Sequence, residues 1–185
     1  MRIDMTYGGI MNKQIRWLTK TALLIACTVV VQSLSKLIPL GPYGNFITGS
    51  LVNMCLLISA SMVGLSSGAI VGIITPFVAL LTGTAIPIIF VPFVAMGNFI
   101  LVLSFHFLKK HNVIHVLVPA AIKSVFLYAA INLMLSAMQL PPEKATAMLY
   151  LFSWPQLITA IIGGAMALFI VSRINKSKDS VWKEG

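Results

Sequence analysis

The chain has 185 residues, of which 58% are hydrophobic and only 9% are charged, and its mean hydropathy is +0.97. A soluble domain cannot cover its surface with so few charges, so the composition indicates an integral membrane protein. The formal net charge of +9 comes from basic residues clustered at both ends and in one central break, which suits a membrane surface rather than nucleic acid. A buried carboxylate pair and a carboxylate metal site are both disfavoured, because the four acids lie outside the long apolar runs: Asp4, Glu143, Asp179 and Glu184.

The apolar segments predict an all-α integral membrane protein, a compact bundle of six transmembrane helices. Residues 37–108 contain no charge, a stretch too long for one span, so we place uncharged turns at residues 64–68 and 82–87, where Pro87 cannot continue a helix. We expect a single membrane domain over residues 1–185, with residues 1–16 and 174–185 as cytoplasmic tails. The predicted helices cover residues 17–36, 46–63, 66–81, 88–108, 113–137 and 147–173.

The distribution of basic residues orients this bundle in the cell membrane. Ten basic residues lie before or in the first turn of the first predicted helix, after the fourth, or at the end of the sixth and beyond it, whereas only Lys36 and Lys144 fall on the opposite side. The positive-inside rule therefore places both termini in the cytoplasm, as an even number of spans requires. The links at residues 38–45 and 140–144 would then face outward.

Polar side chains recur along one face of the fifth predicted helix. Their spacings of four, four, four and three keep them on one slowly drifting face, and they are Ser124, Tyr128, Asn132, Ser136 and Gln139. This face could form the wall of a solute-binding pocket. Hydrogen bonding between helices is the alternative explanation.

Two further groups of polar residues are candidates for the same pocket. Asn98 follows a glycine in the fourth helix, where a ligand or a neighbouring backbone could approach closely. The outer end of the sixth helix carries Trp154, Gln156 and Thr159. The ring of a ligand could stack on the tryptophan there and form hydrogen bonds with the polar side chains. The alternatives are an interfacial tryptophan and amides that only join helices.

Lys123 is the one charged residue deep inside a predicted helix, roughly 15 Å from its start. A substrate carboxylate would explain it, although Lys123 lies about 100° around the helix from Ser124 and farther still from Asn132. Snorkelling toward the headgroups and pairing within the protein are the alternatives.

Several chemistries have no support in the sequence. The chain lacks the G-x-x-x-x-G-K-[ST] motif of ATPases, so it cannot hydrolyse ATP itself, and any energy must come from elsewhere. His106, His111 and His115 flank a basic break, and we expect a solvated loop there rather than a metal site. An intramembrane hydrolase would need Ser66 or Ser67 with His106 as base, but no G-x-S-x-G surrounds them.

Three short motifs together resemble the substrate-binding S components of energy-coupling factor (ECF) transporters. They are Ala-xxx-Ala at residues 22–26, Pro-Phe-Val-Ala-Met-Gly-Asn at 92–98 and Trp-Pro-Gln-Leu-Ile-Thr at 154–159. The resemblance covers nearly the whole chain. It implies a receptor that captures a vitamin or related micronutrient from outside and associates with a transmembrane coupling protein and two cytoplasmic ATPases, without a cofactor.

The resemblance also assigns roles to individual residues. Ala22 and Ala26 would dock on the coupling protein. The pocket would lie in the outer half of the bundle. The residues implicated by position are Tyr43 and Asn45 in the first outer loop, and Asn98, Asn132, Gln139, Trp154, Gln156 and Thr159 on or beside the later helices. Riboflavin receptors of the family carry Asn and Lys where this chain has Gln156 and Thr159, which argues against riboflavin.

The absence of acids from the predicted helices bears on the charge of the solute. A cation buried there would lack a counter-ion, so a neutral heterocycle or a mono-anion paired with Lys123 is favoured over a thiamine-like cation. Our candidates are pantothenate, pyridoxine-like and hydroxymethylpyrimidine-like compounds. A small membrane scaffold or assembly protein is the alternative to a receptor.

Overall fold

The computed structural model describes residues 3–37, 44–83, 87–108, 114–138 and 142–181, and the regular elements of these residues are all helical. The elements, in chain order, are α1 (Ile3–Leu37), α2 (Gly44–Met62), α3 (Leu65–Leu81), the 3-10 helix η2 (Ile88–Phe90), α4 (Val91–Phe107), α5 (Ile114–Met138), α6 (Pro142–Leu151) and α7 (Trp154–Val181). The expected all-α bundle is therefore confirmed for the described residues.

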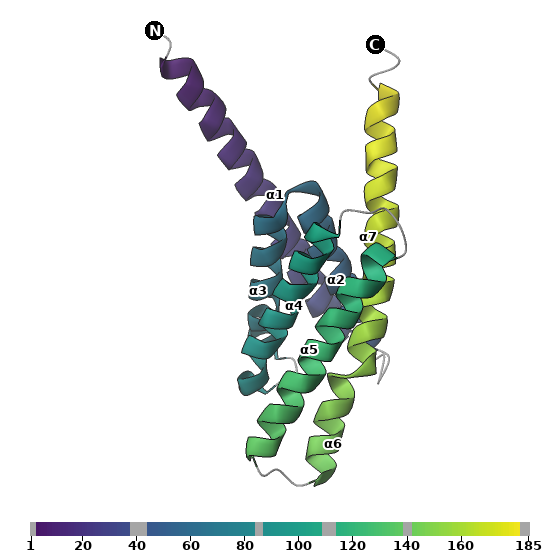
Figure 1. The fold of residues 1–185 in the computed structure, drawn as a ribbon. Coiled ribbons are helices and arrows are strands. Elements are labelled where there is room, and N and C mark those ends of the chain that lie inside the picture. Colours follow the sequence, from purple (N-terminus) through teal and green to yellow (C-terminus); the bar gives the residue numbers. More distant parts are fainter. Residues whose placement is uncertain (1–2, 38–43, 84–86, 109–113, 139–141, 182–185) are drawn as a thin grey trace.

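Helix α2 lies at the centre of this bundle. It packs against α1, α3, α4 and α7, while α5 lies between α4 and α7. The described ends of α1 and α7 project from the same end of the bundle, and α6 lies at the opposite end (Figure 1). This arrangement is the one that an even number of crossings produces.

Five stretches are long and apolar enough to cross a membrane by length and composition, and they are residues 12–34, 44–62, 88–107, 114–138 and 142–176. Helix α3 is also apolar but has only 17 residues. At about 1.5 Å per residue it spans about 25 Å, slightly less than a hydrocarbon core of about 30 Å. The chain is a multi-pass membrane protein, and α3 is the shortest of the six predicted spans.

The last predicted helix is not continuous, which corrects the expectation for residues 147–173. The chain turns at Phe152 and Ser153, between α6 and α7. Pro155 explains the break, because it has no N–H to donate to the carbonyl of Leu151 and because its ring would clash with that carbonyl in a continuous helix. The first helix also begins at Ile3 rather than at residue 17, so the expected N-terminal tail is largely helical.

The predicted turn between α2 and α3 is present and depends on Gly64. This residue has φ of 130°, a conformation that side chains with a Cβ atom rarely adopt. Its N–H donates to the carbonyl of Ser59, and its own carbonyl accepts from Gly68. The turn can therefore be tight without leaving these backbone groups unpaired.

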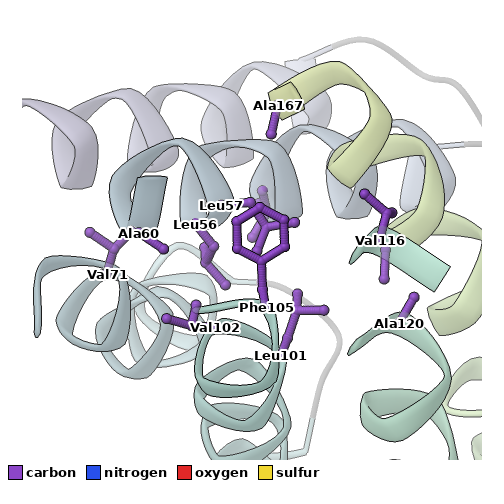
Figure 2. Close-up of a cluster of buried hydrophobic side chains, with 12 residues drawn as sticks. Leu56, Leu57, Ala60, Val71, Leu101, Val102, Phe105, Val116, Ala120 and Ala167 are labelled. Atoms are coloured by element: carbon purple, nitrogen blue, oxygen red, sulfur yellow. The ribbon is translucent and has the colours of Figure 1, made fainter. Parts of the chain in front are cut away.

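The apolar core lies where α2, α3, α4, α5 and α7 meet. Its largest members include Leu56, Leu57, Leu101 and Phe105, each no more than 5% exposed. Figure 2 shows these side chains converging between the helices, with Val116 and Ala120 together at the right of the view. The core fixes the relative positions of the helices that carry the polar side chains described below.

Helix α1 buries polar residues and exposes apolar ones, the reverse of a helix in a soluble protein. Thr21, Thr28 and Gln32 are buried, and the Thr21 hydroxyl lies 2.7 Å from that of Ser67 on α3. Gln32 donates from Nε2 to the carbonyl of Thr75. Polar groups that cannot reach water are thus paired inside the bundle, and the apolar outer face suits lipid or another protein.

Small residues on α7 allow it to lie unusually close to α2. A Cβ atom added to Gly163 would lie 2.8 Å from Cβ of Asn53 and closer still to the carbonyl oxygen of Ser50. Ala160 and Ala167 on the same helix are fully buried. These small residues of α7 therefore serve packing within the bundle.

We expect Gly163→Ala to destabilise the protein by about 1–3 kcal/mol, because the added methyl meets backbone atoms that cannot move independently. The measurement is the thermal or denaturant unfolding midpoint of the purified chain in detergent. Ala165→Leu adds more volume at an exposed position of the same helix and should leave the midpoint nearly unchanged. Equal midpoints for wild type and Gly163→Ala would contradict the close contact.

Candidate functional site

Lys123 lies at the centre of the bundle, and its side chain is only 2% exposed. Its ammonium nitrogen Nζ donates to Oδ1 of Asn53 at 2.7 Å and to Oδ1 of Asn98 at 2.8 Å. The three residues come from α5, α2 and α4. The snorkelling alternative for Lys123 is therefore wrong, because the side chain points into the bundle and is bound there.

Asn98 connects this lysine to the backbone of α3. Its Nδ2 donates to the carbonyl of Gly72 at 3.0 Å. In an uninterrupted helix that carbonyl would accept from the residue four positions later, but this residue is Pro76, which has no N–H. The proline thus frees a carbonyl inside the bundle, and Asn98 satisfies it.

Asn53 connects the same lysine to α7. Its Nδ2 donates to Oγ1 of Thr159 at 3.4 Å, and Oγ1 of Thr159 donates to the backbone carbonyl of Gln156 at 3.2 Å. Asn53, Asn98 and Thr159 are each no more than 4% exposed. Together with Lys123 and the Gly72 carbonyl they form a polar cluster to which five helices contribute, and we refer to it as the central cluster.

A protonated Lys123 has no acidic partner among the residues that the structure describes. Between Asp4 and Glu143 the sequence contains no acid, and Glu143 is exposed in the first turn of α6. The two asparagine oxygens that bind Lys123 are dipolar but neutral. A buried ammonium in such surroundings is costly, so the group either loses its proton or needs a further group that compensates for its charge.

Other candidate residues lie at the end of the bundle where α2 and α7 begin (Figure 1). Trp154 is 46% exposed; its ring centroid lies 5.6 Å from that of Phe46 and 5.4 Å from that of Tyr150. Gln156 is partly exposed, and Asn45 is exposed in the first turn of α2. The structure thus places an aromatic group a short distance along α7 from Thr159 of the central cluster.

The polar face of α5 divides into a buried and an exposed part. Ser124 is buried and donates to the carbonyl of Ser153 at 3.1 Å. Tyr128 and Asn132 are exposed, so a role in a pocket wall stays a prediction for both. Tyr43 and Gln139 lie outside the described residues.

Asn53 is the one side chain of the central cluster that sequence reasoning missed. It stands in Val-Asn-Met, in the middle of an apolar helix, and an amide at that depth needs a partner. A second available signal was the spacing of four between Gly72 and Pro76, which marks a freed carbonyl. Neither signal identifies the partner without the packing of the helices.

A separate cleft lies at the other end of the bundle, where α1 meets the end of α2. Its volume is about 170 Å³, and its lining residues are Lys13, Arg16, Trp17, Lys20, Met62 and Val63. Basic residues and a tryptophan in the first turns of a membrane helix are typical of a headgroup interface. The cleft does not include any member of the central cluster.

Comparison with known proteins assigns the family. A family model described as the substrate-specific component of ECF transporters matches residues 16–174. The chain therefore belongs to this family of membrane transport subunits, which bind substrates and are not enzymes. Searches of curated proteins and of solved structures give no significant match.

Proposed function

We propose that this chain is the S component of an ECF importer that captures a water-soluble vitamin or related micronutrient from outside the cell. Import would require a transmembrane coupling protein and two cytoplasmic ATPases. The observation that carries the proposal is the central cluster, which concentrates buried polar groups from five helices in an otherwise apolar membrane bundle. A membrane receptor for a polar solute needs such groups, because the solute gives up its hydrogen bonds to water when it binds.

We further propose that the bundle crosses the membrane six times with both termini in the cytoplasm. The basic residues in the N-terminal half of α1, after α4 and in the C-terminal turns of α7 support this orientation. The solute would enter from the end at which α2 and α7 begin, which also carries Trp154 and Gln156. In this orientation the central cluster would be the inner limit of the pocket.

The orientation predicts which positions can be labelled from outside. A cysteine introduced at Asn45, in a variant whose Cys27 and Cys55 are replaced by serine, should react with a membrane-impermeant maleimide in intact cells. A cysteine at Asn12 should react only after the membrane is permeabilised. The reverse pattern would contradict the positive-inside assignment.

The receptor function can be tested by ligand-dependent thermal stabilisation of the purified chain. A ligand that binds only the folded state raises its stability in proportion to the logarithm of its concentration, about 2.7 kcal/mol at one hundred times Kd. The panel should hold pantothenate, pyridoxine and hydroxymethylpyrimidine, with thiamine and riboflavin as the disfavoured members. We expect one of the first three to stabilise the chain.

Variants then locate the pocket. Gln156→Ala and Asn132→Ala should weaken the binding of the identified solute, whereas Ser172→Ala, an exposed change near the other end of α7, should not. Unchanged binding in both pocket variants would mean that the pocket lies elsewhere. Absence of stabilisation by every member of the panel would favour the scaffold alternative.

A further inference from the structure

We propose that Lys123, held by Asn53 and Asn98, is the binding site for a carboxylate group of the transported solute. This inference rests on the proposed function and specifies its substrate class as organic anions. It starts from the unbalanced charge of the central cluster. Two amide oxygens accept hydrogen bonds from the ammonium, but they supply no negative charge.

The hydrogen-bonding capacity of the cluster is suited to one additional acceptor. An ammonium has three N–H groups, and Lys123 gives two of them to described residues. The amide nitrogen of Asn53 makes the longest bond of the cluster, 3.4 Å to Thr159, and this bond is the easiest to exchange for a ligand oxygen. Lys123 and Asn53 could thus donate to the two oxygens of a carboxylate.

The net charge distinguishes a carboxylate from a phosphate. One ammonium balances one carboxylate, whereas a phosphate monoester carries about −1.5 to −2 at neutral pH and would bring unbalanced charge into the membrane. The nearest acids in the sequence, Asp4 and Glu143, lie at the start of α1 and at the start of α6. A mono-anionic solute would therefore itself supply the negative charge that balances Lys123.

The direct probe is formate, because it presents a carboxylate with almost nothing else. We expect sodium formate to raise the unfolding midpoint of the full chain in a concentration-dependent way, relative to sodium chloride at the same ionic strength. Formamide, which has nearly the same shape and no charge, should not. Equal effects of formate and formamide, or no effect of formate, would overturn the proposal.

Two variants remove the anion site by different routes. Lys123→Gln removes the positive charge, and Asn53→Asp places a carboxylate of nearly the same shape beside the ammonium, so that the chain itself supplies the counter-ion. Both should abolish the response to formate. Asn53→Asp should also remain folded, because it pairs a buried charge, so its loss of response cannot be attributed to unfolding. Ser136→Ala, an exposed change on α5, is the control that should respond like wild type.

The matched pairs pantothenate and pantothenol, and nicotinate and nicotinamide, separate this inference from the proposed function. If a carboxylate member binds, Lys123→Gln should weaken it at least about tenfold, equivalent to about 1.4 kcal/mol. A neutral solute that binds the wild type and Lys123→Gln equally would leave the receptor function intact and overturn the inference. A response to formate in a chain that binds no member of either panel would support the anion site and contradict a vitamin receptor.

Discussion

Proteoliposomes that contain this chain alone should accumulate no substrate, even with ATP on both sides of the membrane. The chain has no nucleotide-binding motif, and a binding protein without an energy source can only equilibrate its solute. Co-reconstitution with an ECF coupling protein and its two ATPases should produce accumulation against a gradient. The measurement is uptake of the radiolabelled solute identified in the stabilisation experiment.

The matched control is the complete assembly with an ATPase subunit whose P-loop lysine is replaced by alanine. This assembly should bind the solute and fail to concentrate it. Accumulation by the isolated chain would contradict its assignment as a receptor that depends on partners, and ATP-dependent accumulation with the inactive ATPase would have the same consequence.

The positions of most helices could be predicted from the sequence because apolar segments of membrane length are a strong signal. The segment predicted at residues 113–137 corresponds to α5 at Ile114–Met138, and Gly64 marks the turn between α2 and α3. The break before α7 was missed because residues 142–173 are apolar enough to be taken for one continuous span. Pro155 was visible in the sequence, and it lies in the first turn of α7, where proline is common. Its position could therefore have marked the start of a new helix.

The central cluster was only partly predictable for a different reason. Asn98, Lys123 and Thr159 each stood out as polar residues in apolar helices. The angle between Lys123 and Asn132 on α5 suggested that the lysine was far from the amides. Its partners, however, come from α2 and α4, and periodicity within one helix carries no information about the packing of others.

Replacing both Ala22 and Ala26 by leucine should reduce transport by the reconstituted complex at least about tenfold and leave solute binding by the isolated chain unchanged. The two alanines lie one helical turn apart on α1 and are exposed, as is Leu23 between them. Helix α1 packs against α2 and α3 with its polar face, so its small apolar residues remain available to a neighbouring protein. Leucine at these positions would hold a partner helix several ångströms away, because small residues are what permit close approach in membranes.

The control is Ala129→Leu, the same change at an exposed position of α5, which should leave both transport and binding unchanged. Binding is measured by thermal stabilisation of the purified chain, and transport by uptake into proteoliposomes. A parallel loss of binding and transport in the double variant would show that the alanines serve packing within the bundle. Full transport with intact binding would place the docking surface on another helix. Transport lost with binding retained is the result expected if the exposed face of α1 meets the coupling protein, since α1 contributes no side chain to the central cluster, where we propose that the solute binds.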